Sequence, residues 1–388
     1  MRLLHTADWH VGKSIRGRSR LDDEFAPALD EVVGIAKHEG VDAVLLAGDV
    51  YEQRAPAPEA DALVFETFVR LHELGIPVVV IPGNHDSAVR FAALGTLLQA
   101  IGVTVVARVA PPASGGVVEV GSRDGTQTAL VACVPFVPER RFGDAAALFD
   151  ATETWYQSYA EGMGNVLGAM ATAFRDDRIN VVLGHLFTDG ALLGGGEREI
   201  TTGMAYAISP GRLPGTANYV ALGHVHKPQT VRGAPAPTRF AGSLLQLDFG
   251  EAQQTKSVTI VDAEPGRPAS TREVPLSAGR PLLDVRGTLD QVLARADDVH
   301  DAYLRVFVSV DAPVPGIADR VREVLPNALD VHLEYERVQE QAHQGPPLSA
   351  LAPREQFISS YTAYNGVAPS EPILEAFDEV ATSELEGS

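Results

Sequence analysis

The sequence is poor in cysteine and in long apolar runs. Of its 388 residues one is a cysteine, Cys133, so no disulfide can form within the chain, and the apolar run around it is typical of a buried strand. No apolar run approaches the roughly 20 residues that a transmembrane helix needs, so we expect no membrane partner. The first ten residues are too polar for a secretory signal, which predicts a cytoplasmic protein.

Positive charge is scarce as well. Lys and Arg number 31 against 51 Asp and Glu, which gives a net charge of −20 at pH 7. This balance argues against a nucleic-acid partner, because proteins that bind phosphate backbones usually carry a basic surface. Bound divalent cations would reverse the potential locally. One stretch, 11–20, contains no acid and is compatible with either a solvated loop or a DNA contact through Lys13, Arg16, Arg18 and Arg20.

The first part of the chain alternates between short apolar runs and amphipathic segments. Strands are predicted at 2–6, 43–47 and 77–81, and helices at 21–39, 58–74 and 88–100. Strands separated by helices of this length form βαβ units with parallel strands and right-handed crossovers. The pattern therefore predicts a parallel sheet.

The following segments are richer in strands. They are predicted at 116–120, 128–134, 181–184, 219–222, 238–241 and 257–261, with a helical stretch near 145–175 and a glycine-rich loop at 188–203. The simplest arrangement is an α/β fold in which two sheets pack together as a sandwich flanked by helices.

The rest of the chain predicts three further parts beyond a sandwich domain at 1–275. A small α/β capping domain is expected at 280–338, a polar linker at 339–352 and a helical segment at 353–388. The strands of the small domain are predicted at 282–286, 303–310 and 332–337, and its helices at 289–299 and 317–325. The last helix has an apolar face opposite an acidic one, a pattern typical of a helix that docks on a partner; the apolar residues are Ile373, Leu374, Phe377 and Val380.

Polar side chains follow five of the predicted strands. The motifs are Asp8-Trp-His10, Gly48-Asp49, Gly83-Asn-His-Asp86, Gly184-His185 and Gly223-His-Val-His226. The carboxyl ends of parallel strands are where open α/β sheets place their sites. Carboxylate, amide and imidazole ligands without cysteine are typical of a pair of divalent cations that activate water and hold phosphate, and they argue against a structural zinc site. Each motif alone is weak, but all five together predict a two-metal phosphoesterase.

The motif set resembles the calcineurin-like metallophosphoesterases. The segments 4–12, 223–229 and 240–243 make the chain similar, over nearly its whole length, to the SbcD-type DNA repair nucleases within that superfamily. This resemblance implies a Mn²⁺-dependent 3′–5′ exonuclease and endonuclease that cleaves duplex and hairpin DNA in repair, recombination and replication. It implies two divalent cations per subunit, with Mg²⁺ as the alternative to Mn²⁺. It also implies a nucleoid-associated homodimer that works with an SbcC-type coiled-coil ATPase.

The resemblance also implies roles for individual residues. One cation would be held by Asp8, His10 and His226, and the other by Asn84, His185 and His224. Asp49 would bridge the two cations, and His85 would be the catalytic acid. Asp86 would orient the ring of His85. Glu52 departs from the pattern, because such nucleases commonly carry Asp or His there, and its role is left open.

Two other functions remain open from the residues alone. A calcineurin-like phosphodiesterase or phosphatase that acts on nucleotides or phosphoproteins would share the same fold and metals. The additional segments at 280–338 and 353–388 favour the nuclease, since a small-molecule esterase needs neither. A non-catalytic scaffold would have lost metal ligands, whereas all seven expected positions carry suitable side chains.

Overall fold

The computed structural model describes residues 1–139, 142–143, 159–197, 206–312, 314–335, 351–365 and 367–386. It divides the chain into two compact units, Met1–Glu334 and Tyr335–Ser388. The first part of the helix predicted near 145–175, the end of the loop predicted at 188–203 and most of the predicted linker lie outside the described residues. Within those residues, no helix has the length and apolar character needed to cross a bilayer.

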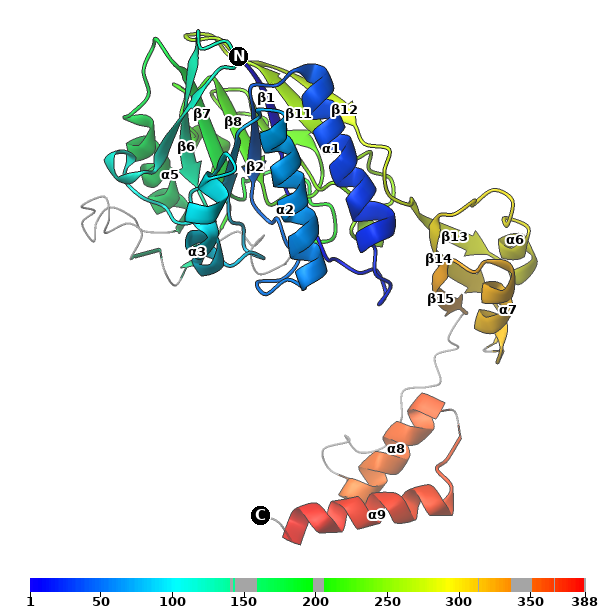
Figure 1. Ribbon diagram of the computed structural model, residues 1–388. Coiled ribbons are helices and arrows are strands. Elements are labelled where there is room, and N and C mark those ends of the chain that lie inside the picture. The colour runs from blue at the N-terminus through cyan, green and yellow to red at the C-terminus, as the bar shows by residue number, and fades with distance from the viewer. Residues whose placement is uncertain are drawn as a thin grey trace. The chain divides into compact units, whose positions relative to one another are not determined.

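The first sheet contains the predicted parallel strands. Its strand order is β12-β11-β1-β2-β3-β4. Strands β1 to β4 are parallel to one another, β11 is antiparallel to β1, and β12 is antiparallel to β11. The strands are β1 (Arg2–Thr6), β2 (Ala43–Ala47), β3 (Val78–Ile81), β4 (Val103–Val105), β11 (Ser257–Asp262) and β12 (Ser270–Pro275). The helices α1 (Ala26–Glu39), α2 (Pro58–Glu73) and α3 (Ala88–Gln99) cover its outer face (Figure 1). A turn of π-helix at Leu21–Phe25 leads into α1.

The second sheet has the strand order β5-β6-β7-β8-β10-β9. Its central strands β6, β7, β8 and β10 are parallel, and the edge strands β5 and β9 are antiparallel. The elements are β5 (Val117–Gly121), β6 (Thr128–Val134), β7 (Ile179–His185), β8 (Tyr219–Gly223), β9 (Gln229–Thr230), β10 (Thr238–Phe240) and, on the outer face, α5 (Tyr159–Ala171). The predicted two-sheet α/β sandwich is therefore confirmed.

Alternation along the strands builds the core between the two sheets. In β1, Leu3 points toward the second sheet, whereas its neighbour Leu4 packs under the helices, because successive side chains of a strand face opposite sides. The layer between the sheets also contains Cys133, which is fully buried as predicted, and burial raises the pKa of its thiol. Both faces of the central strands are thus covered, which is why β2 and β3 consist of apolar residues throughout.

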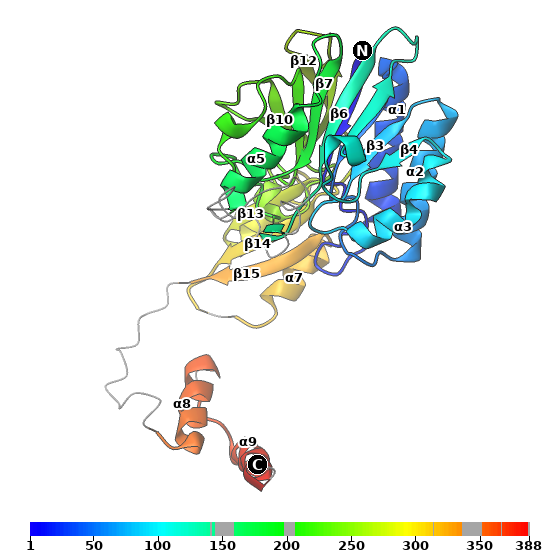
Figure 2. The ribbon, with the colours of Figure 1, turned by 90° about the vertical axis from the view of Figure 1, so that its left-hand side faces the viewer.

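A third, three-stranded parallel sheet follows the sandwich in the chain. It consists of β13 (Leu282–Gly287), β14 (Tyr303–Ser309) and β15 (Ala328–Glu334), with α6 (Leu289–Leu293) and α7 (Ile317–Val324) as its helices (Figures 1 and 2). This sheet has an apolar core of its own. Its first row of side chains, Leu282 and Tyr303, packs against Ile15 and Phe249 of the sandwich.

Two predicted boundaries in this part were wrong. The last strand begins at Ala328 and ends at Glu334, four residues earlier than its predicted start at 332. The first helix ends at Leu293 and is followed by turns, although the apolar pattern predicted a helix to 299.

The C-terminal unit is a pair of helices, α8 (Pro353–Asn365) and α9 (Glu371–Glu386). The rings of Phe357 and Phe377 stack with centroids 4.3 Å apart, and Arg354 forms a salt bridge of 3.0 Å with Asp378. Part of the apolar face of α9 is therefore covered by α8.

Candidate metal centre

The predicted metal ligands lie together at the carboxyl ends of five strands. The backbone N–H of His224, after β8, donates a hydrogen bond of 2.9 Å to Oδ1 of Asp8, after β1. The Nδ1–H of His185, at the end of β7, donates a hydrogen bond of 2.8 Å to the carbonyl oxygen of Ala47 in β2. These contacts join the strand ends of the two sheets. All seven candidates are buried: Asp8, His10, Asp49, Asn84, His185, His224 and His226.

Four of these side chains form a tight cluster. Oδ1 of Asn84 lies 3.0 Å from Nε2 of His185 and 2.9 Å from Nδ1 of His224. The two ring nitrogens are 3.2 Å apart, and Oδ2 of Asp49 lies 3.4 Å from Nε2 of His185. Three of the members, Asp49, His185 and His224, offer ligand atoms within 4.8 Å of one another. This spacing suits several donors around one cation.

A second cluster shares Asp49 with the first. Asp8, His10 and Asp49 offer ligand atoms within 4.8 Å of one another, and Nε2 of His10 lies 3.7 Å from Oδ2 of Asp49. The ring of His226 lies close by, with its centroid 4.8 Å from that of His10. Nε2 of His10 is buried and has no hydrogen-bond partner among the described residues. A buried ring nitrogen of this kind fits a divalent cation, because a buried polar atom is costly unless it has a partner.

The backbone is unusual at four of the candidate ligands. Asp8, His10 and Asp49 have φ angles of 49°, 48° and 50°, and His224 has 94°. Non-glycine residues in this left-handed region are uncommon, and they cluster at functional sites where the surrounding structure holds them in place. The loops after β1, β2 and β8 are therefore bent so that these four side chains point into the centre.

Glycines allow the strand ends to approach one another closely. A Cβ atom on Gly83 would lie 2.1 Å from Oδ1 of Asp49, and one on Gly223 would lie 2.0 Å from the carbonyl oxygen of Ala47. At Gly48, whose φ is 88°, the added atom would lie 2.3 Å from Nδ1 of His185. Only Gly48 of the three combines close approach with a left-handed backbone, so close approach is the more general reason for glycine here.

The substitution Gly83→Ala should displace Asp49 and lower stability. The new methyl group has no room beside the buried carboxylate, and overpacking of this kind costs about 1–3 kcal/mol. Gly34→Ala is the matched control, since Gly34 lies in α1 with no atom within 4 Å of an added Cβ, and it should stabilise by about 0.5–1 kcal/mol. Urea unfolding of both variants without metal measures the two effects, and equal stability of the variants would contradict the packing argument.

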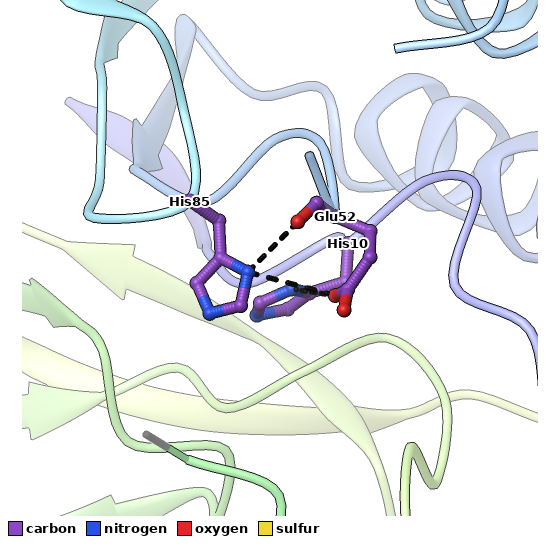
Figure 3. A group of neighbouring side chains, drawn as sticks. All are labelled: His10, Glu52 and His85. Atoms are coloured by element: carbon purple, nitrogen blue, oxygen red, sulfur yellow. Dashed lines mark hydrogen bonds and ion pairs between the residues drawn. The ribbon is translucent and has the colours of Figure 1, made fainter. Parts of the chain in front are cut away.

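Glutamates that the motifs did not include hold two of the histidine rings. The Nδ1–H of His10 donates to Oε2 of Glu52, and that of His226 donates to Oε1 of Glu251, each over 2.9 Å. The Nδ1–H of His85 donates over 2.9 Å to the backbone oxygen of Glu52, so this residue reaches both His10 and His85 (Figure 3). Glu52 stood out in the sequence only as a departure from the family pattern, and nothing in the sequence pointed to Glu251.

Asp86 does not orient His85 in the way expected. Its carboxylate accepts hydrogen bonds from the backbone N–H groups of Val50, Tyr51 and Gly83, at 3.1, 3.0 and 2.9 Å. Because the ring of His85 is held by Glu52, the role expected for Asp86 is corrected. Asp86 ties the loop after β3 to the loop after β2.

Burial and neighbouring charges shift the pKa values of the centre. Burial raises the pKa of Asp8 to about 7, and burial together with the charge of Asp49 raises that of Asp86 to about 7. Burial alone would lower the pKa of His185, but Asp49 and Asp8 outweigh it and raise this pKa to about 9. The neighbouring histidines outweigh burial at Asp49 and hold its pKa well below its usual range.

These pKa values predict that cation binding releases protons. Asp8 and His185 are protonated below about pH 7 and about pH 9, respectively, and a cation needs both in their deprotonated forms. Affinity for Mn²⁺ should therefore fall as the pH falls from about 9 to about 6, and at neutral pH between about one and two protons should leave per pair of cations, one from His185 and about half of one from Asp8. Calorimetry in buffers of different protonation enthalpy measures this number. An affinity that does not change with pH would contradict the assignment of these residues as ligands.

The basic stretch at 11–20 makes mostly internal contacts. Lys13 forms a salt bridge of 2.9 Å with Glu52, and Arg16 forms one of 2.5 Å with Asp330 of the third sheet. Nη1 of Arg18 donates to Oδ1 of Asn327 over 3.2 Å.

The predicted DNA contact of Arg20 was wrong. Its side chain is buried, forms a salt bridge of 2.6 Å with Glu24 and donates to the carbonyl oxygen of Gln246 over 2.8 Å. It supports the fold and cannot reach DNA in this arrangement. DNA contacts of Lys13, Arg16 and Arg18 stay predictions.

Two family models match the chain. The model for the calcineurin-like phosphoesterases matches residues 1–228, and the model described as type 5 capsule protein repressor C-terminal domain matches residues 278–365. Among solved structures, a dimetal phosphatase from Danio rerio is 11% identical over 72% of this chain and 99% of that chain, with a TM-score of 0.39. A likeness at that level adds nothing to the family assignment.

Curated relatives match over most of their own length. The chain is 32% identical to the D subunit of nuclease SbcCD of Bacillus subtilis (strain 168), over 98% of both chains. It is 28% identical to the D subunit of nuclease SbcCD of Escherichia coli (strain K12), over 92% of both chains. The chain therefore belongs to the calcineurin-like phosphoesterases and, among them, to the SbcD-type nucleases, which are metal-dependent phosphodiester hydrolases.

Proposed function

We propose that the chain hydrolyses DNA phosphodiesters at a centre of two Mn²⁺ ions, as a 3′–5′ exonuclease and as an endonuclease that opens hairpins. Asp8, His10 and His226 would hold one cation, and Asn84, His185 and His224 the other, with Asp49 between them. The observation that carries the proposal is the position of Asp49, whose Oδ2 lies 3.4 Å from His185 and 3.7 Å from His10. A carboxylate within reach of both clusters suits a bridging ligand.

The protein residues around the cations would bind and orient the substrate and move its proton. Two bound cations lower the pKa of a water and neutralise charge on the phosphate oxygens. His85 would donate a proton to the leaving 3′ oxygen. Because its Nδ1–H is engaged by the Glu52 backbone, this proton would come from Nε2, on the other edge of the ring.

The proposed partners follow from the named relatives. These relatives are D subunits of nuclease SbcCD, so we infer that this chain binds an SbcC-type coiled-coil ATPase. We propose in addition that it forms a homodimer and acts on DNA at the nucleoid in the cytoplasm. The net charge of −20 makes metal binding important for DNA affinity, because the protein as a whole repels phosphate.

Cleavage of labelled substrates tests the function. Duplex DNA and a DNA hairpin should be cleaved with Mn²⁺, less with Mg²⁺, and not with a chelator, whereas mononucleotides and a phosphopeptide should remain intact. Release of phosphate from the small substrates without cleavage of DNA would favour a nucleotide or protein phosphatase of the same fold.

Removing the C-terminal unit should separate cleavage from partner binding. A chain that ends at Ala352 keeps every proposed ligand, so Mn²⁺-dependent cleavage by the isolated protein should persist while binding to the ATPase is lost. The physical reason is the apolar face of α9, which α8 covers only in part, through contacts such as Phe357 with Phe377.

Pull-down of the ATPase with the full-length chain and with the truncated chain measures the loss of binding. Arg354→Gln is the control, since its salt bridge with Asp378 is about half exposed and contributes little to stability. Capture of the ATPase by the truncated chain would place the docking surface elsewhere.

A further inference from the structure

His10 and His226 have the same environment on the edge of the ring that faces away from the proposed cation. In each, the Nδ1–H donates to a glutamate carboxylate over 2.9 Å, to Oε2 of Glu52 in one case and to Oε1 of Glu251 in the other. The two glutamates lie far apart in the sequence and on different loops. A carboxylate in this position fixes the ring orientation and makes the opposite nitrogen a better electron donor to a metal.

Each of these glutamates is in turn held by a lysine. Lys13 Nζ lies 2.9 Å from Oε1 of Glu52, and Lys256 Nζ lies 2.6 Å from Oε2 of Glu251. The sequence contains only four lysines, against 27 arginines, and two of the four occupy these positions. Glu251 also accepts a hydrogen bond of 3.1 Å from the backbone N–H of Leu247, so its carboxylate is fixed on several sides.

The other proposed cation site is built differently. The Nδ1–H of His185 donates over 2.8 Å to a neutral backbone carbonyl, that of Ala47, and the carboxylate of Asp8 lies farther away, with its Oδ1 4.0 Å from that nitrogen. His224 directs Nδ1 toward Oδ1 of Asn84, inside the ligand cluster itself. The amide of Asn84 is also neutral, whereas Asp8, its counterpart at the first site, carries a charge when a cation is bound.

We propose that Glu52 and Glu251 are positioning residues that make the Asp8–His10–His226 site the tighter of the two cation sites. The inference rests on the ligand assignment of the proposed function. Asp49 is common to both sites and favours neither. Among the contacts described above, Asp8 and two glutamate-supported imidazoles on one side stand against the amide of Asn84 and the carbonyl-supported imidazole of His185 on the other. Negative charge and oriented donors both strengthen cation binding.

Unequal sites change how the enzyme responds to metal supply. The tighter site would keep its cation through purification and through many turnovers. The weaker site would fill only at higher free Mn²⁺, or together with the phosphate of the substrate, which supplies additional oxygen ligands. The Mn²⁺ concentration that gives half-maximal cleavage would then reflect the affinity of the weaker site.

Titration calorimetry of the metal-free full chain with Mn²⁺ tests this inference. The wild type should show two binding events whose affinities differ by about 10-fold or more. Glu52→Gln and Glu251→Gln should each weaken the tighter event about 10- to 100-fold and leave the weaker one unchanged. Asn84→Ala should remove the weaker event. Glu334→Gln is the matched control, because Glu334 pairs with Arg286 on the third sheet, and it should change neither event.

The outcomes separate this inference from others. Equal affinities in the wild type, or glutamate variants that weaken the second event, would overturn it. Glu251→Gln leaves Lys256 buried without its charge partner and can unfold the chain. In that case Glu52→Gln alone tests the inference, because Glu52 is 19% exposed. Thermal unfolding of the metal-free variants shows whether each of them is folded. Two unequal events in a protein that cannot cleave DNA would refute only the proposed function, and DNA cleavage with two equal events would refute only this inference.

Discussion

Replacing His85 by leucine should lower the rate of DNA cleavage about 100- to 10,000-fold, the usual contribution of general acid catalysis. His85 is buried beside the centre, and its ring centroid lies 4.6 Å from that of His10. Its neighbour Asn84 directs its side-chain oxygen into the ligand cluster, whereas the ring of His85 is held at the Glu52 backbone. Both cations and DNA should therefore still bind to the variant.

The leaving group provides the internal control for His85. A nitrophenyl ester needs little protonation as it departs, so His85→Leu should slow its hydrolysis far less than that of DNA. Metal content, DNA affinity and both rates are measured on one preparation. Loss of a cation would make His85 a ligand, and equal losses on both substrates would show that it stabilises the phosphate instead of donating a proton.

Changing Asp49 to asparagine should weaken both cation sites, by about 100-fold or more, since a coordinating charge is lost and not only a supporting contact. Oδ2 of Asp49 lies between His10 and His185, and Oδ1 accepts the backbone N–H of His85 over 2.8 Å. The amide retains the size of the side chain but removes the charge that both clusters share. DNA cleavage should then be lost at Mn²⁺ concentrations that saturate the wild type.

His226→Ala is the comparison for Asp49. It removes a ligand from one site only, so one binding event should weaken while the other remains. Asp262→Asn, at a half-exposed salt bridge with Arg2, should affect neither. Two unchanged binding events in Asp49→Asn would disprove the bridging role.

The sequence predicted the central strands well, because they are apolar on both faces and bounded by polar motifs. The limits of β1, β2 and β6 agree with the prediction residue for residue. The edge strands β4 and β12 were not predicted. β4 has only three residues, and β12 is almost entirely exposed and polar, so neither shows the alternation or apolar run that marks a strand.

The sequence also indicated that the candidate ligands lie together, because each motif follows a predicted strand and sites in α/β sheets lie at the carboxyl ends of parallel strands. The sequence could not predict the residues that hydrogen-bond to these ligands. Glu251 is 25 residues from the histidine that it holds, in a short turn with no motif of its own. Arg20 was misjudged for a related reason: four neighbouring basic residues suggested one surface, although Arg20 is buried against Glu24. Contacts between distant segments decided both cases.

The left-handed backbone at Asp8, His10, Asp49 and His224 limits which mutations these positions can accept. Aspartate and histidine belong to the few residue types other than glycine that enter this region at modest cost. Glycine would suit the backbone but offers no ligand, and a β-branched residue would suit neither requirement. Asn84, His185 and His226 are not among the residues with positive φ, so their backbone adds no restriction to that set by their burial and chemistry. In a library of random variants, the first four positions should therefore tolerate fewer substitutions than the other three, even among variants scored for folding alone.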